Sequence, residues 1–165
     1  MTSPQQSTRT ADVSTPTDRT IRIERVFDAP RERVFGVYTD PELVSEWWGP
    51  RGTTTAVDVM EPKTGGRWRF VCKNPDGSED GFRGAYREVT PHERVVQTFE
   101  WEGMPGHVSV ETATFEDLGD RTKVTTTAIY HTTEERDGML GSGMERGLNE
   151  TYARLDELLA RLAAR

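Results

Sequence analysis

The strongest pattern in this chain lies at its C-terminal end, where apolar residues recur at spacings of three and four. That period is typical of an amphipathic helix with one apolar stripe. A helix of this kind is stable only when its stripe covers another apolar surface. The stripe consists of Met144, Leu148, Tyr152, Leu155, Leu158, Leu159 and Leu162. The preceding residues must therefore form a surface that one long helix can cover.

Most of the preceding chain has the alternation of polar and apolar side chains that is typical of β-strands. The first such segment begins at Ile21, and two short helices are predicted after it, over 31–38 and 39–48, with Pro30 and Pro41 near their first turns. Six more strands follow between turns rich in Gly, Pro and Asp. They are 54–60, 66–73, 81–89, 94–102, 107–117 and 121–131. This order predicts an α+β fold, in which a curved seven-stranded antiparallel sheet wraps around the C-terminal helix.

The length of 165 residues suits a single domain. The first twenty residues include nine Ser or Thr and few apolar residues, so we expect a disordered tail over 1–19 and one domain over 20–165. The net charge of -7 argues against a nucleic-acid-binding surface. No apolar run is long enough to insert into a membrane, and the N-terminus lacks a signal-peptide pattern, so a cytoplasmic location is expected.

Several phrases in this order resemble one family. They are VFDAPRERVFGVYTDPELVSEWWGP, VDVMEPKTGGRWRF, GAYREVTPHERVVQTFEW and DLGDRTKVTTT. Together they are similar to the START-like (SRPBCC) superfamily, and most similar to the branch named after the C-terminal domain of the activator of the 90-kDa heat-shock chaperone ATPase. The resemblance covers about residues 20–162. It implies the helix-grip fold, with a cavity between the sheet and the long helix.

One position departs from the resemblance. Relatives often have Gly-Trp on the last helix, where this chain has Gly147-Leu148. A smaller side chain at this position leaves more room in the implied cavity and removes an indole N–H donor. Just before it, the glycine-rich segment 136–147 is predicted either as a plain loop or as a mobile flap at the cavity entrance.

The main functional hypothesis is that the cavity binds a small hydrophobic or aromatic molecule without covalent chemistry. The residues expected to line it are Trp48, Trp68, Phe70, Phe82, Tyr86, Phe99, Trp101, Met144, Leu148 and Tyr152. Two alternatives stay open. The first is an interaction protein similar to the chaperone-ATPase activators, with a chaperone or a second copy of the chain as partner. The second is an enzyme similar to polyketide cyclases and lyases, which would need two titratable groups facing each other inside the cavity.

The adjacent Trp47 and Trp48 raise a separate question. On a short helix, neighbouring side chains point about 100° apart, so both can hardly face the same core. One reading is that both seal the end of the sheet. The other, which we prefer, is that Trp47 is a structural plug and Trp48 forms part of the cavity rim, because Gly49-Pro50 ends the helix there.

The remaining chemistry-bearing residues predict no catalytic group, metal site or cofactor. The three histidines are scattered and have no zinc-ligand spacing. Cys72 alternates with Trp68 and Phe70, which predicts a buried thiol that acts as a small hydrophobe. Carboxylates such as Asp58, Glu61 and Glu111 are numerous, but the sequence alone names no acid–base pair among them.

Overall fold

The computed structural model describes residues 10–165, and residues 1–9 lie outside its described part. Eight strands form one antiparallel sheet in the order β1-β2-β8-β7-β6-β5-β4-β3. The strands are β1 (Asp12–Ser14), β2 (Thr20–Phe27), β3 (Thr54–Met60), β4 (Arg67–Lys73), β5 (Glu79–Thr90), β6 (Arg94–Trp101), β7 (Val108–Asp117) and β8 (Thr122–Ile129). The helices are α2 (Arg31–Thr39), α3 (Pro41–Trp47), α4 (Thr133–Leu140) and α5 (Met144–Ala163). The predicted α+β helix-grip fold is confirmed, with one strand more than expected.

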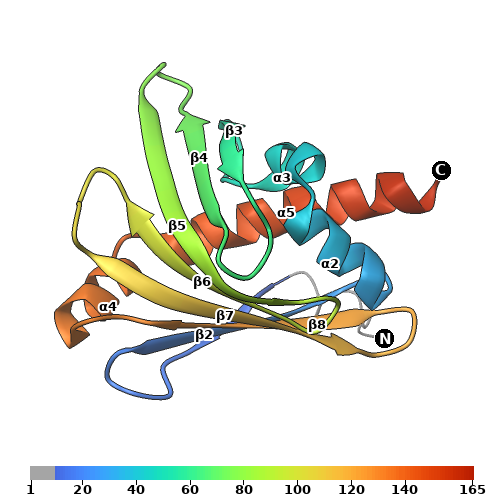
Figure 1. Ribbon diagram of the computed structural model, residues 1–165, viewed down its shortest axis with the longest axis horizontal. Helices are drawn as coiled ribbons and strands as arrows, with labels where there is room; N and C mark the ends of the chain where they lie inside the picture. The colour runs from blue at the N-terminus through green and yellow to red at the C-terminus, as the bar shows by residue number, and fades with distance from the viewer. Residues whose placement is uncertain (1–9) are drawn as a thin grey trace.

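The long helix α5 crosses the concave side of the curved sheet (Figure 1). Its apolar stripe is buried there, and Leu155 and Leu158 are fully inaccessible to solvent. Tyr152 packs edge-on against Phe27 of β2, with ring centroids 5.2 Å apart. Burial of this stripe, and not helix propensity alone, is what holds α5 in place.

The two short helices α2 and α3 close one end of the sheet (Figure 1). The side chain of Asp40 caps α3 by accepting a hydrogen bond from the Glu42 backbone N–H at 2.9 Å, and Pro41 occupies the first turn. In α2, Val34 and Val37 are fully buried. The Asp40 cap and Pro41 explain why α3 begins where the sequence predicts, whereas α2 begins just after Pro30 without a side-chain cap.

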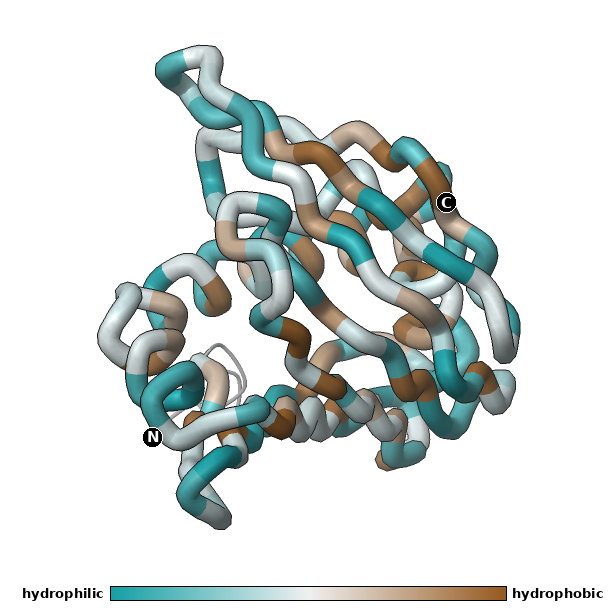
Figure 2. The backbone as a smooth tube through the Cα atoms, turned by 60° about the vertical axis from the view of Figure 1, so that its left-hand side comes forward, coloured by the Kyte–Doolittle hydropathy of each residue, from teal (hydrophilic) through white to brown (hydrophobic). Residues whose placement is uncertain are grey.

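Polar and apolar residues alternate along the strands, as the teal and brown segments of Figure 2 show. The alternation is interrupted twice, because the pairing register shifts between Val57 and Val59 in β3 and between Tyr86 and Glu88 in β5. Irregularities of this kind bend a strand and increase its twist. They help the sheet to curve around α5.

The expected boundary between tail and domain is wrong, because residues 12–14 form β1 on the edge of the sheet. Val13 pairs with Ile23 of β2, and Ala11 is buried. The Ala11 backbone N–H also donates to Asn149 Oδ1 of α5 at 3.0 Å. β1 covers the edge of β2 that would otherwise be open. The sequence did not predict this strand, because Ala11 and Val13 are the only apolar residues of a short Ser/Thr-rich segment. The expectation for residues 1–9 lies outside the described residues.

The glycine-rich segment before α5 contains a helix, where a loop or flap was predicted. Thr132 caps α4 by accepting a hydrogen bond from the Glu135 backbone N–H at 3.1 Å. Gly143 has a φ of 83°, a left-handed conformation that glycine adopts readily, and α5 begins at the next residue. Among residues 10–165, no helix has the length and apolar composition needed to cross a bilayer.

Candidate ligand-binding cavity

A cavity of about 210 Å³ lies between the concave face of the sheet and the helices α2, α3 and α5. Its walls come from segments far apart in the sequence, so it exists only in the folded chain. The lining residues are Ile23, Tyr38, Val44, Trp47, Trp48, Phe70, Tyr86, Val95, Gln97, Phe99, Glu111, Ala113, Thr126, Leu148, Thr151 and Tyr152. Most of this surface is aromatic or aliphatic, and a few polar groups are concentrated on the sheet side.

Part of the predicted site lies in this cavity. The predicted residues that line it are Trp48, Phe70, Tyr86, Phe99, Leu148 and Tyr152. Leu148 lines the cavity from the first turns of α5. A cavity of about 150 Å³ is large enough to hold benzene, so the present volume suits a molecule with one aromatic ring and a short substituent.

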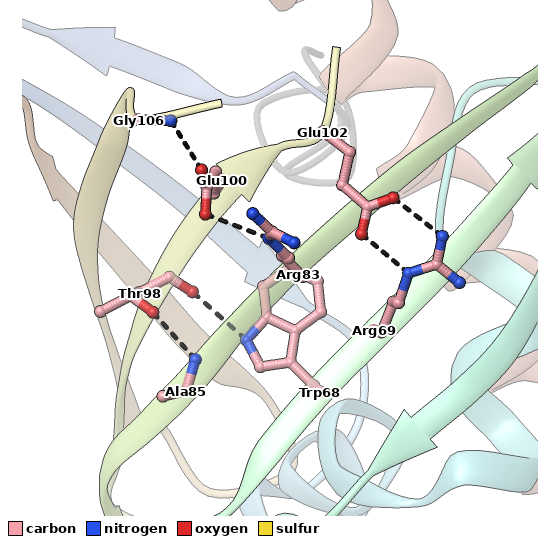
Figure 3. Close-up of polar contacts among 8 residues, drawn as sticks. All are labelled: Trp68, Arg69, Arg83, Ala85, Thr98, Glu100, Glu102 and Gly106. Carbon is pink, nitrogen blue, oxygen red and sulfur yellow. Dashed lines mark hydrogen bonds and ion pairs between the residues drawn. The ribbon is translucent and has the colours of Figure 1, made fainter. Parts of the chain in front are cut away.

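Trp68 is one of the predicted residues that does not line the cavity. Its ring is fully buried, and its Nε1 donates a hydrogen bond to the Thr98 carbonyl oxygen at 3.2 Å (Figure 3). The indole passes over Gly84 of β5, where an added Cβ would lie 2.5 Å from Nε1 and 1.9 Å from the Thr98 carbonyl oxygen. The absent side chain of Gly84 thus lets Trp68 act as a structural brace between β4 and β6.

The other three predicted residues lie around the cavity and not in its walls. Phe82 is partly buried and packs behind Trp48, with ring centroids 5.2 Å apart. Met144 packs against the core at the start of α5. Trp101 is 37% exposed at the end of β6, and its Nε1 donates to the Asp80 carboxylate at 3.2 Å. Alternation along a strand predicted Phe82 and Trp101, and the helical stripe predicted Met144, but neither pattern shows how far the cavity extends.

Ion pairs on the outer face of the sheet connect side chains of the neighbouring strands β4, β5 and β6. Arg69 donates to both carboxylate oxygens of Glu102 at 2.7 and 2.8 Å, and Arg83 donates to Glu100 at 3.2 Å (Figure 3). Glu100 also accepts from the Gly106 backbone N–H at 2.7 Å. These contacts lower the pKa values of both glutamates. They belong to the surface of the sheet and not to the cavity.

The tryptophan pair has two different environments. Trp47 is buried, and its Nε1 donates to the Val37 carbonyl oxygen of α2 at 2.9 Å. Trp48 is only partly buried, and its ring packs against Phe70 with a centroid separation of 5.2 Å. Both rings line the cavity, so Trp47 joins the helices together and also forms a wall.

Sequence reasoning predicted Tyr86 but missed Gln97 and Glu111 as polar groups of the cavity. Tyr86, Gln97 and Glu111 pair in register across β5, β6 and β7, so they form one row across the concave face. Glu111 is partly buried, and its carboxylate makes no hydrogen bond or ion pair with any group of residues 10–165. The Tyr38 hydroxyl is buried and has no hydrogen-bond partner there either. A signal was present in the sequence, because Glu111 shares its strand face with Phe115, which is buried.

Burial raises the pKa values of Glu111 and of the tyrosines around it. It raises the pKa of the Glu111 carboxyl to about 7, because an ionised carboxylate is poorly solvated inside the cavity. Burial also raises the pKa of the Tyr86 and Tyr130 phenols, and the Glu111 charge raises that of Tyr130 further. The pKa of Tyr38 is raised by burial and by the neighbouring Tyr152. The cavity therefore contains a carboxyl that changes protonation near neutral pH beside phenols that stay neutral.

Cys72 is buried, as predicted, and does not line the cavity. Its Sγ lies 3.2 Å from Thr55 Oγ1, and burial raises the pKa of the thiol. A thiol whose pKa is raised in this way is a poor nucleophile. The position of Cys72 fits the predicted role of a small hydrophobe.

Comparisons with solved structures extend over nearly the whole chain. A protein from Rhodobacter sphaeroides is 26% identical, with a TM-score of 0.85 over 92% of this chain and 99% of that one. A protein from Arthrobacter aurescens is 24% identical, with a TM-score of 0.83 over 91% of each chain. The AHSA1 protein from Silicibacter pomeroyi is 23% identical, with a TM-score of 0.72 over 86% of this chain and 97% of that one.

The comparison with curated proteins gave no match. The family model described as "Activator of Hsp90 ATPase homolog 1-like protein" matches residues 28–160, from the end of β2 to the last turns of α5. The match includes the tryptophan pair, all strands from β3 to β8, and every cavity-lining residue except Ile23. This chain therefore belongs to the family of Activator of Hsp90 ATPase homolog 1-like proteins.

Proposed function

We propose that this protein binds a small aromatic molecule in the cavity between the sheet and α5. The observation that carries the proposal is the lining itself, in which Trp48, Phe70 and Phe99 form aromatic walls around a volume of about 210 Å³. Ligand sites are typically concave and mostly apolar, with a few polar groups that fix orientation. The row of Tyr86, Gln97 and Glu111 supplies such groups on one side.

The size of the cavity limits the ligand to about one ring with a short chain, since roughly 150 Å³ holds benzene. Larger hydrophobic molecules would need α5 or the short helices to move. Trp47 and the Arg25–Asp156 ion pair both oppose such a movement, because they tie α3 to α2 and β2 to α5. We therefore expect a compact ligand and not a long acyl chain.

The first test is to identify what the protein carries from its own host. Native mass spectrometry of the gently purified protein, followed by extraction and analysis of bound small molecules, should give a mass increment from one aromatic compound. A second test uses 2-phenylethanol, a neutral one-ring probe, in a calorimetric titration. It should bind wild type and should bind Ala113→Leu at least tenfold more weakly, because the larger side chain fills the cavity.

A matched control for Ala113→Leu is Ala160→Leu, which makes the same change on an exposed position of α5. It should bind the probe like wild type. If 2-phenylethanol fails to bind wild type, or binds Ala113→Leu equally well, the cavity is not the binding site.

A second candidate function, an acid–base enzyme, is favoured by one observation. The Glu111 charge raises the pKa values of the Tyr130 and Tyr152 phenols, and Tyr152 lines the same cavity. A carboxyl with a pKa near 7 is suited to general acid–base catalysis. Conversion of the extracted ligand by wild type, and loss of that conversion in Glu111→Gln, would favour the enzyme over simple binding. The family description makes an Hsp90-type chaperone a further partner to test, by stimulation of its ATPase.

A further inference from the structure

We propose that the cavity selects aromatic molecules that carry a cationic nitrogen, and that Glu111 is the carboxylate that pairs with this nitrogen. The inference rests on the proposed binding function, because it names the ligand class of the same cavity. It follows from the position of Glu111, from the charges that surround it and from the aromatic walls that face it.

The position of Glu111 is unusual among the carboxylates of this protein. It lies in the middle of β7 on the inner face, paired with Gln97 of β6 and Ala128 of β8. Several other glutamates of the sheet have a cationic partner, such as Glu102 with Arg69 and Glu24 with Lys123. Glu111 has no such partner within the described residues, although it lines the cavity. A partly buried carboxylate in a mostly apolar cavity loses solvation without gaining a partner, and a bound cation would offset that cost.

The groups that face Glu111 from the surrounding elements do not supply a positive charge. They are the phenols Tyr152 from α5, Tyr38 from α2 and Tyr86 from β5, together with Tyr130 after β8. All four have pKa values raised above the ordinary phenol value, so they are neutral at physiological pH.

Arg25 of β2 is a buried cation beneath α5. It does not line the cavity, and both of its terminal nitrogens donate to the Asp156 carboxylate. Arg25 is therefore committed to its own ion pair and leaves Glu111 uncompensated. The lack of compensation agrees with the pKa of Glu111, which burial raises to about 7.

The aromatic walls complete the recognition chemistry. Trp48, Phe70, Phe99 and Tyr152 line the same cavity as Glu111. The faces of aromatic rings attract ammonium groups, and the attraction is larger when the cation is desolvated. The proposed ligand class is an arylalkylamine, because its ammonium group can pair with the Glu111 carboxylate and its ring can pack against the aromatic walls. An anionic ligand would be repelled, and a neutral one could gain only a hydrogen bond. The net charge of -7 also favours the approach of a cation.

Three probes of matched size separate these cases in calorimetric titrations at pH 8. They are 2-phenylethylamine, which is cationic, 2-phenylethanol, which is neutral, and phenylacetate, which is anionic. We expect the amine to bind wild type about tenfold or more tightly than the alcohol, and phenylacetate to bind weakest. In Glu111→Gln the advantage of the amine over the alcohol should fall to within about twofold. Glu116→Gln, an exposed position on the same strand, should keep the wild-type preference.

A pH series on wild type tests the same inference without a variant. Because Glu111 must be ionised to pair with the amine, amine affinity should fall about fivefold or more between pH 8 and pH 5.5. The affinity for 2-phenylethanol should stay nearly constant. If the alcohol binds but the amine has no advantage, or if Glu111→Gln keeps the advantage, the cation inference is overturned and the binding function stands. If none of the three probes binds wild type, both are overturned.

Discussion

Arg25 of β2 donates hydrogen bonds to both carboxylate oxygens of Asp156 on α5, at 3.0 and 2.6 Å. The two residues are 131 positions apart in the sequence, so the pair joins the first long strand to the last helix. The Arg25 side chain is only 2% exposed, and its guanidinium lies 4.8 Å from the centre of the Phe27 ring. The ion pair and this aromatic contact together fix where α5 lies on the sheet.

Asp156→Ala should lower the free energy of unfolding by about 2–3 kcal/mol, because Arg25 then stays buried without a counter-charge. Denaturant unfolding monitored by circular dichroism measures the change. Glu157→Ala is the matched control, since Glu157 is the next residue on α5 and pairs with Arg51 at the exposed surface. That control should cost less than about 1 kcal/mol. Equal losses in the two variants would contradict the role of the buried pair.

Trp47→Ala should destabilise the protein by about 3–5 kcal/mol, since it removes a buried ring and the hydrogen bond to Val37. Trp48→Ala should cost less, because its ring is only partly buried, but it should weaken binding of 2-phenylethanol. Chemical denaturation gives the free energy of unfolding of each variant, and calorimetric titration gives its affinity for 2-phenylethanol. A larger stability loss in Trp48→Ala than in Trp47→Ala would reverse the assignment of the two rings.

Gly84→Ala should lower the free energy of unfolding by about 1–3 kcal/mol, because the new Cβ would lie 1.9 Å from the Thr98 carbonyl oxygen and displace Trp68. The matched control is Gly36→Ala within α2, where a Cβ would meet nothing within 4 Å. That change should stabilise by about 0.5–1 kcal/mol, since alanine favours helix over glycine. Thermal melts of both variants should therefore shift in opposite directions. A Gly84→Ala protein as stable as wild type would show that the strand relaxes without cost.

The pH dependence of stability should contain a contribution from Glu111. Burial raises its pKa from 4.5 in water to about 7, so the folded state keeps a proton that the unfolded state releases within this window. The free energy of unfolding should therefore decrease as the pH rises through the window, by at most about 3 kcal/mol, and level off above it.

The measurement compares urea unfolding of wild type and Glu111→Gln at several pH values. Glu111→Gln removes the titrating group, so its stability relative to wild type should increase with pH and be greatest above the window. Glu116→Gln, on the same strand and exposed, should keep the wild-type profile. A constant difference between wild type and Glu111→Gln across the window would show that Glu111 titrates normally.

Removal of residues 1–18 should lower the melting temperature by about 4 °C or more, because it removes β1 and the Ala11 contact with Asn149. Ala11→Glu in the full chain should reproduce much of the loss by placing a charge at a buried position. Differential scanning calorimetry compares the two with wild type. If the shortened chain melts at the wild-type temperature, β1 contributes nothing to stability, as the sequence alone suggested.

Local sequence signals were sufficient to predict most of the secondary structure. The period of the C-terminal stripe predicts α5, and Asp40 with Pro41 predicts the start of α3. The quoted phrases predicted the family and, through it, the helix-grip fold. These features depend on neighbours a few residues apart, so they can be read without knowing the tertiary contacts.

The tertiary structure decided which strand face is inside and how far the cavity extends. In β7 the alternation separates Val108 and Val110 from Glu111 and Phe115, but it does not say which set faces α5. The fold buries Phe115 and so carries Glu111 into the cavity, whereas Val108 is exposed. The Trp68 ring packs over Gly84 of β5 and binds the Thr98 carbonyl oxygen instead of lining the cavity, because Gly84 has no side chain in its way. Such outcomes depend on contacts between residues far apart in the chain, and a period-two pattern carries no information about those contacts.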